Sequence, residues 1–177
     1  MSTATETNSE NGNVKRSQLT KTHTLSVLVE NKAGVLARVA GLFARRGFNI
    51  ESLAVAPTDD RFSRITIVVD AESAPIDQIR KQLDKLIDVI DIVELSPEHS
   101  ALREMVLVRL ELDDEAKVAD VETLVEGFSG SVLRVRGAQM MLSLSSRPND
   151  LDAFLEKLAP FGIAELQRTG AIAIPGI

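Results

Sequence analysis

The stretch LSVLVENKAGVLARVAGLFARRGFNIESL, residues 25–53, decides the fold of this chain. It begins as an alternating apolar segment that ends at Asn31-Lys32-Ala33-Gly34, continues with apolar residues at helical spacing, and reaches a second strand after Asn49. This order places a glycine and free backbone N–H groups at the N-terminus of a helix, with carboxamides nearby. Such a corner favours binding of a small anionic or zwitterionic ligand over catalysis.

The elements expected around this stretch follow the order βαββαβ. Leu25, Val27 and Val29 alternate with other residues as in a half-buried strand, and Gly47 stands where the end of a helix favours a left-handed residue. The expected elements are, in order, a strand over 24–30, a helix with Val35, Leu36, Val39, Leu42 and Phe43, strands over 50–57 and 63–70, a helix opened by Ser73 and Pro75 with Ile76, Ile79, Leu83, Leu86 and Ile87, and a strand over 89–95.

The same order restarts after a polar, turn-prone linker at 96–100. The expected elements are a strand over 104–112, a helix capped by Asp113 and Asp114 with Val118, Val121, Leu124, Val125 and Phe128, strands over 131–136 and 139–145, a helix with Leu151, Phe154, Leu155 and Leu158 that Pro160 and Gly162 stop, and a short strand over 163–167. The chain is therefore predicted to be α+β, with two ferredoxin-like βαββαβ units whose antiparallel sheets carry helices on one face. The predicted boundaries are a disordered leader at 1–21, a first unit at 22–96, a second unit at 101–170 and a tail at 171–177.

Composition excludes several classes of function. The net charge is −6, with Lys and Arg mixed among acids, which argues against a nucleic-acid partner. The chain has no cysteine, which removes disulfides, zinc-thiolate sites and thiol catalysis and fits a cytoplasmic protein. No apolar run approaches membrane-spanning length, so no membrane contact is expected. The two histidines, His23 and His99, lie far apart without a ligand pattern, so no metal site is expected.

The size of the units predicts a homodimer. Each unit has about 70 residues, near the size at which one hydrophobic core gives marginal stability, and an exposed sheet edge then favours pairing with another unit. We expect dimerisation through the N-terminal unit, because the ligand corner at Asn31 lies at a strand end where a neighbour could close it.

Four segments resemble the family of regulatory (small) subunits of acetolactate synthase, also called acetohydroxyacid synthase, whose N-terminal half is an ACT domain. The segments are VLVENKAGVLARVAGLFARRGFNIESLAVAPTDD at 27–60, SRITIVV at 63–69, KQLDKLIDVIDIVEL at 81–95 and PFGIAELQRTG at 160–170. Within them GLFARRGFNIESL, at 41–53, is highly specific. The resemblance implies an ACT domain at 22–96 that binds an amino acid, and a C-terminal domain at 101–170 that supports activation and dimerisation.

The resemblance also implies a function. Such a subunit has no catalytic residues of its own: it binds the catalytic subunit, raises its activity and confers feedback inhibition by valine or the related leucine and isoleucine. No cofactor is expected on this chain, whereas thiamine diphosphate, Mg and FAD are expected on the catalytic partner.

Site residues follow from the same resemblance. Asn31, Ala33 and Gly34 match the ligand turn, Val35 and Leu36 match positions whose backbone N–H groups receive the amino-acid carboxylate, and Asn49, followed by Ile50, matches the carboxamide contributed across the dimer. The implied interface with the catalytic subunit comprises Leu42, Phe43, Arg45, Arg46, Phe48 and Glu51. The chain departs from the pattern at Ala33, where many members carry Pro or Ser, at Ala54, where others carry Thr, and in a shorter hairpin turn at 58–64.

Other interpretations stay open on spacing alone. Asn31 is equally suited to capping the helix, Gly34 to a simple turn, and Arg45 and Arg46 to a solvated helix end. A stand-alone amino-acid sensor of the ACT type would present the same corner. An acylphosphatase-like enzyme would require an Arg in the anion loop, which supplies only Lys32. An RNA-binding module would require exposed aromatics on central strands, and the chain has no Tyr or Trp.

Overall fold

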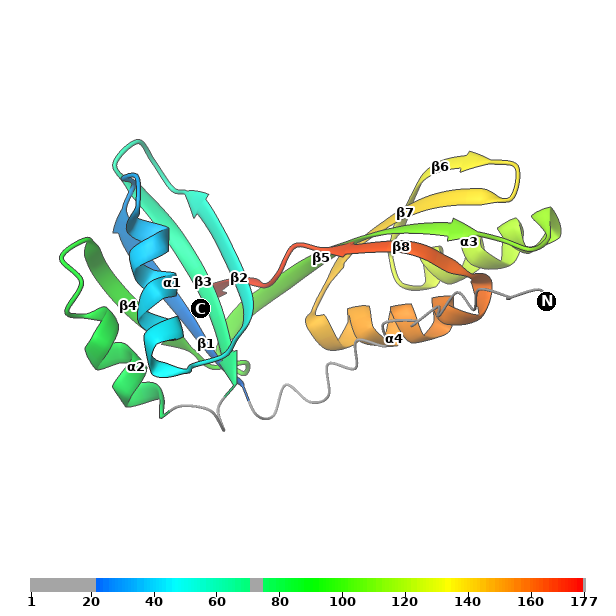
Figure 1. Ribbon diagram of the computed structural model, residues 1–177. Coiled ribbons are helices and arrows are strands. Elements are labelled where there is room, and N and C mark those ends of the chain that lie inside the picture. The colour runs from blue at the N-terminus through cyan, green and yellow to red at the C-terminus, as the bar shows by residue number, and fades with distance from the viewer. Residues whose placement is uncertain (1–21, 71–74, 177) are drawn as a thin grey trace, which may run out of the picture.

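The computed structural model describes residues 22–70 and 75–176, which form two units that each combine an antiparallel sheet with two α-helices (Figure 1). The first sheet has the strand order β2-β3-β1-β4 and the second has the order β6-β7-β5-β8. Both orders are those of the ferredoxin-like βαββαβ arrangement, and in both units the helices cover one face of the sheet. The predicted fold class is confirmed.

The first unit contains the strands β1 (Thr22–Glu30), β2 (Ile50–Pro57), β3 (Phe62–Asp70) and β4 (Val89–Leu95) and the helices α1 (Val35–Arg46) and α2 (Ile76–Leu83). Every ladder in this sheet is antiparallel. The core lies between the sheet and the helices, where alternate residues of β1 meet the apolar face of α1. Gly47 ends α1 at φ +68°, and its N–H donates to Ala44 O, as the helix period predicts.

Helix α2 is shorter than predicted. Its apolar spacing continues through Leu86 and Ile87, but the helix ends at Leu83 and the chain turns through hydrogen bonds from Leu86 N–H to Leu83 O and from Val89 N–H to Leu86 O. The turn lets the Asp88 carbonyl oxygen accept from Glu30 N–H at 2.9 Å, and it leaves Ile87 93% exposed. The predicted helix start at Ser73 lies outside the described residues, and Pro75 is the residue before α2.

The second unit contains the strands β5 (Ser100–Glu111), β6 (Ser131–Arg136), β7 (Gln139–Ser146) and β8 (Ile163–Arg168), the helices α3 (Val118–Gly127) and α4 (Pro148–Leu158), and 3₁₀ turns at Glu115–Lys117 and Ala159–Phe161. Strand β5 begins four residues earlier than predicted. Pro160 lies inside the second 3₁₀ turn, and Gly162, at φ +80°, ends that turn. Asp114 caps the first 3₁₀ turn through Ala116 N–H.

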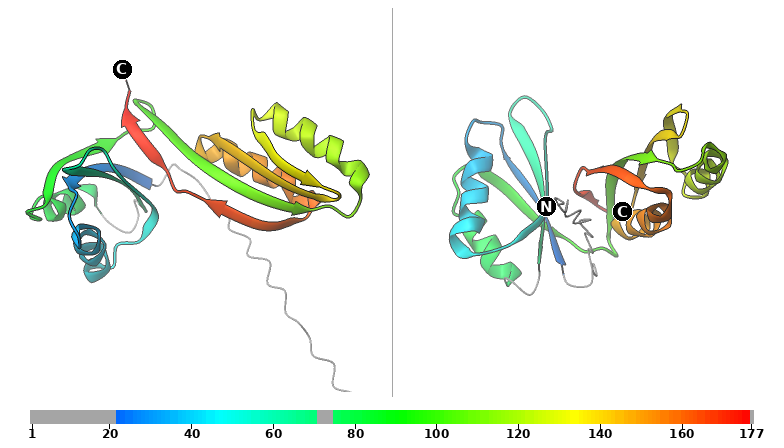
Figure 2. Two further views of the ribbon diagram at one scale, coloured as in Figure 1. Left: turned by 90° about the horizontal axis from the view of Figure 1, so that it is seen from above. Right: turned by 45° about the vertical axis from the view of Figure 1, so that its right-hand side comes forward.

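The C-terminal residues predicted as a tail contain another strand, β9 (Ile172–Pro175). It pairs with the beginning of β5, from Ser100 to Arg103, while β8 pairs with β5 from Val106 onward. Strands β8 and β9 therefore follow one another along β5, and the left view of Figure 2 shows them running together toward the first unit. The predicted linker is reduced to a tight turn, in which His99 N–H donates to Ser96 O at 3.2 Å.

The two units touch where β8 passes into β9. Ala171 N–H donates to Ser52 Oγ at 2.9 Å, and the Ser52 side chain is buried at the start of β2. Gly170 has φ +80°, and a Cβ atom at this position would lie 2.7 Å from Ser52 Oγ. Only glycine combines that backbone conformation with so close an approach.

Candidate functional site

The turn between β1 and α1 holds Asn31 against the neighbouring hairpin. Asn31 N–H donates to Arg61 O at 2.7 Å, and Asn31 Oδ1 accepts from Ser63 Oγ at 3.1 Å. The residue that caps α1 is Gly34, with no side-chain cap hydrogen bond. The alternative in which Asn31 serves as the helix cap is therefore wrong.

The N-terminus of α1 is open to an anion. Gly34 has φ +84°, the left-handed conformation that glycine favours, and the first turn of α1 contains no acidic residue. Val35 N–H makes only a long hydrogen bond of 3.3 Å to Lys32 O. Because the first N–H groups of a helix have no partners within the helix, an oxyanion from outside is a suitable acceptor here.

Two ion pairs flank the turn. Arg38 donates from Nε and Nη2 to Asp88 Oδ2, each at 2.8 Å, and a Cβ atom on Gly34 would lie 3.5 Å from Arg38 Nη1. Lys32 Nζ contacts Glu30 Oε2 at 2.6 Å, and this hydrogen bond raises the pKa of Lys32. A guanidinium therefore stands beside the open N–H groups, but the nearly buried Asp88 carboxylate neutralises it.

Sequence reasoning missed Arg38 and Asp88. Arg38 could have been found, because it lies four positions after Gly34 and therefore on the same face of α1. Asp88 could not, because 50 positions separate it from Arg38 and only the shortened α2 brings it to the turn.

The hairpin beside the turn is well formed despite its short loop. Asp59 Oδ1 accepts from the N–H groups of Arg61 and Phe62 at 2.7 and 2.9 Å. Ala54 lies in the middle of β2, opposite Thr66. The departures from the family pattern at 58–64 and at Ala54 therefore leave the sheet intact.

The predicted effector residues form two groups. The structure brings together Asn31, Ala33, Gly34, Val35 and Leu36, whereas Asn49 and Ile50 lie beyond the other end of α1 (Figure 1). A helix of 12 residues is about 18 Å long at about 1.5 Å per residue, so one small ligand cannot reach both groups within a chain. Asn49 Nδ2 donates to Glu51 Oε1 at 2.5 Å and is exposed. A role for Asn49 across a dimer stays a prediction.

The predicted interface with a catalytic subunit needs a correction. Leu42 and Phe43 are only 3% and 1% exposed, because they face the sheet from α1, so their side chains cannot form part of a partner surface. Phe48 is half-buried and packs edge-to-face on Phe43, with 6.2 Å between the ring centroids. The remaining predicted residues, Arg45, Arg46 and Glu51, are exposed.

The equivalent turn of the second unit is closed by its own carboxylates. Asp114 Oδ1 accepts from Ala116 N–H at 2.9 Å, at the position that is open beside Gly34 in the first unit. Asp113 pairs with Lys117 at 2.7 Å, and the hydrogen bond from Lys117 lowers the pKa of Asp113. The Asp114 carboxylate therefore disfavours an anionic ligand at this turn of the second unit.

The described residues include no group of three or more His, Cys, Asp or Glu placed to hold a metal ion. Among the helices of 22–70 and 75–176, none is long and apolar enough to cross a membrane.

Comparison with known proteins covers both units. The family model described as the ACT domain of acetohydroxyacid synthase small subunits matches residues 25–91, and the model described as the small subunit of acetolactate synthase matches residues 103–176. The chain is 50% identical over 156 residues to an acetolactate synthase small subunit of Mycobacterium bovis, covering 87% of this chain and 92% of the relative. It is 46% identical over 156 residues to that of Mycolicibacterium smegmatis, with 88% and 91% covered.

A solved structure is also similar over both units. The crystal structure of the acetolactate synthase small subunit from Thermotoga maritima superposes with a TM-score of 0.81 at 34% identity, and the match covers 89% of this chain and 98% of that one.

Proposed function

This chain belongs to the family of acetolactate synthase small subunits, and on that premise we propose that it activates a catalytic subunit and makes it sensitive to feedback inhibition by a branched-chain amino acid, with valine as the first candidate. The catalytic subunit is the partner that carries thiamine diphosphate, Mg and FAD. The proposed setting is the cytoplasm, in the biosynthesis of valine, leucine and isoleucine.

The open N-terminus of α1 is the observation that carries the effector proposal. An amino-acid carboxylate placed beside Gly34 accepts from the backbone N–H groups of the first turn and gains from the helix dipole. Leu36, which is 43% exposed, offers apolar surface two positions further on for an aliphatic side chain. A charged Asp or Glu side chain in place of the aliphatic one would find no matching cation, because Asp88 already neutralises Arg38.

The ammonium group of the effector needs acceptors from elsewhere. We infer that Asn49 of a second copy supplies its carboxamide oxygen, because the length of α1 keeps Asn49 of the same chain out of reach. The site is then complete only in a homodimer. An effector that prefers one arrangement of the two copies shifts the holoenzyme toward that arrangement, which is what allosteric inhibition requires.

A ligand of this size binds with modest affinity. About eight heavy atoms and a few good hydrogen bonds give a Kd of roughly micromolar to millimolar, or about −4 to −8 kcal/mol, which suits sensing of a free metabolite.

One titration tests the proposal. The chain is mixed with a purified catalytic subunit, and acetolactate formation is measured with and without valine, leucine and isoleucine. We expect the rate to rise when the chain is added and to fall again with at least valine. An unchanged rate on adding the chain would refute activation, and a rate that no amino acid lowers would refute feedback control.

A further inference from the structure

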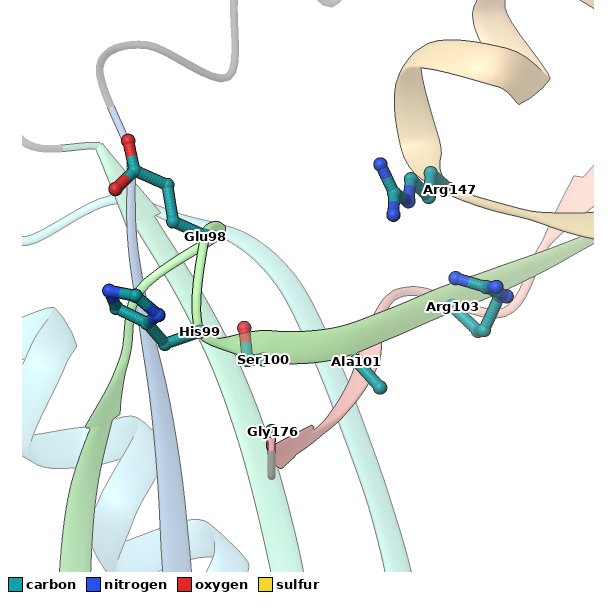
Figure 3. Close-up of a pocket in the computed structure, with 7 residues that line it drawn as sticks. All are labelled: Glu98, His99, Ser100, Ala101, Arg103, Arg147 and Gly176. Atoms are coloured by element: carbon teal, nitrogen blue, oxygen red, sulfur yellow. The ribbon is translucent and has the colours of Figure 1, made fainter.

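A hollow at the junction of the two units lies far from the β1–α1 turn. It has a volume of about 540 Å³ and is bounded by the turn between β4 and β5, the beginning of β5 and the residue before α4 (Figure 3). Its lining includes Glu98, His99, Ser100, Arg103, Arg147 and Gly176. The hollow is near the start of β1 and the open turn follows its end, so the nine residues of β1, about 30 Å at about 3.3 Å per residue, separate the two.

Two guanidinium groups face this hollow without a carboxylate partner. Within the described ranges neither Arg103 nor Arg147 forms an ion pair, and the hydrogen bond of Arg103 goes to the backbone oxygen of Leu102, at 2.9 Å. The chain holds 26 acidic residues against 20 Lys and Arg, so carboxylates are plentiful elsewhere. Two arginines left free at one hollow create a local positive potential in a chain of net charge −6.

The other polar groups of the lining are turned away or already used. Figure 3 shows the His99 ring on the side of the turn away from Arg103 and Arg147, and the Ser100 hydroxyl donates to Ser96 O at 2.5 Å, so the two guanidinium groups carry the recognition of an anion. Glu98 is the acidic residue of the lining, and Figure 3 shows its carboxylate on the side of the turn away from Arg103 and Arg147.

The backbone around the hollow is held by hydrogen bonds within the chain. Gly176 N–H donates to His99 O at 2.7 Å, and a Cβ atom at Gly176 would lie 2.8 Å from the same oxygen. Arg103 lies on the part of β5 that pairs with β9, and Arg147 directly precedes Pro148, the first residue of α4. The backbone of Arg103 is thus held in a paired strand and that of Arg147 adjoins α4, so a ligand has to order only the two side chains.

The residues define the class of ligand. A guanidinium fork binds one phosphate or carboxylate group through two parallel hydrogen bonds, so two forks suit a ligand with two such groups. The volume lies in the range of small-molecule sites, about 300–1,000 Å³, and exceeds what one inorganic ion fills. We propose that this hollow binds a small organic polyanion of the diphosphate class. Arg103 and Arg147 both belong to the second unit, so the ligand would bind there, beside the turn that joins the two units.

Calorimetry on the full chain tests this, with inorganic pyrophosphate as the probe. We expect one pyrophosphate per chain, and a Kd about tenfold higher or more in Arg103→Gln and in Arg147→Gln, since each removes charged hydrogen bonds to the ligand. Arg134→Gln on β6 is the matched control: it is exposed and changes the charge equally, and it should leave the Kd unchanged. Gly34→Asp should also leave it unchanged, which separates this site from the proposed effector site.

Three results would overturn the inference. Absence of heat with pyrophosphate rejects the site, and an equal loss in Arg134→Gln shows that only net charge matters. Binding of citrate with no binding of pyrophosphate assigns the hollow to carboxylates and rejects the phosphate class. Because both arginines are exposed, thermal unfolding of the variants should match that of the parent chain, which verifies that a weaker Kd is not loss of fold.

Discussion

Ser52 and Ala171, 119 positions apart in the sequence, are joined by a buried hydrogen bond of 2.9 Å between Ala171 N–H and Ser52 Oγ. Ser52 follows Asn49, Ile50 and Glu51 at a point where the β2–β3 register shifts. The second unit is therefore attached to the segment that carries two of the seven proposed effector residues, Asn49 and Ile50. The attachment depends on Gly170, whose missing side chain admits Ser52.

Replacing Gly170→Ala should loosen this attachment. The new Cβ atom would stand 2.7 Å from Ser52 Oγ on a backbone at φ +80°, and we expect a loss of about 1–3 kcal/mol in the free energy of unfolding. Gly127→Ala is the control, because that glycine lies in α3 with open space around it and should be neutral or gain up to about 1 kcal/mol. Urea unfolding measures both. Equal urea midpoints for Gly170→Ala and the parent would show that the contact between Gly170 and Ser52 is not tight.

Gly34→Asp should abolish inhibition by valine while activation persists. Its carboxylate would occupy the N-terminus of α1 and repel the carboxylate of the effector. Gly34→Asn has nearly the same shape and the same tolerance of a left-handed backbone but no charge, so it should retain more inhibition. Acetolactate formation with and without valine separates the two. Valine sensitivity that survives in Gly34→Asp would count against the site.

Arg168→Met should destabilise the second unit by about 3 kcal/mol, because it strips Glu104, 2% exposed, of its guanidinium. Arg168 also contacts Asp152, at 2.6 Å. Arg109→Met removes only half-exposed pairs with Glu111 and Glu165 and should cost less than about 1 kcal/mol. Thermal unfolding compares the two variants, and similar Tm values for both would refute the assigned importance of the buried pair.

The charge on Arg168 persists across the working range of pH. Burial alone would lower the pKa of Arg168, but hydrogen bonds from its guanidinium to Glu104 and Asp152 raise it above its ordinary value. A raised folded pKa means that this stabilisation is present below the unfolded value and is lost only as pH rises through the folded one. The difference between Arg168→Met and the parent should therefore not shrink between neutral and mildly alkaline pH.

A homodimer through the first unit should be visible by sedimentation at micromolar concentration. Both edge strands of the first sheet expose apolar side chains, Val55 on β2 at 43% and Ile90 on β4 at 51%. A lysine on the pairing edge should give monomers, whereas a lysine on the other edge should not, so Val55→Lys and Ile90→Lys serve as controls for one another. A parent chain that sediments as a monomer, with and without valine, would refute the dimer.

Local patterns predicted most of the fold, and long-range contacts account for what they missed. The alternation of Leu25, Val27 and Val29 and the glycine at 47 correctly predicted β1, α1 and the end of α1, because the information lies within a few residues. Helical spacing could not show that α2 stops at Leu83, since the turn after it is held by long-range hydrogen bonds from Glu30 N–H to Asp88 O and from Arg38 to the Asp88 carboxylate. Strand β9 was missed because it has only four residues and its partner is 69 positions away at its closest pair, Arg103 and Ile172, outside any local window.

In the candidate site, too, local patterns predicted some features and long-range contacts account for the others. The backbone at Gly34 was predicted from the order of strand, turn and helix, whereas the hydrogen bond from Ser63 to Asn31 depends on the pairing of β1 with β3. The placement of Leu42 and Phe43 in the core was already present in the helical period and contradicts their assignment to a partner surface.

The carboxylate of Asp114 accepts from Ala116 N–H in the second unit, whereas the first turn of α1 contains no acidic residue, so the two units differ in how well they suit an anionic ligand. Since only the first unit leaves this position open, the proposed effector should saturate at one molecule per polypeptide, and a homodimer should hold two rather than four.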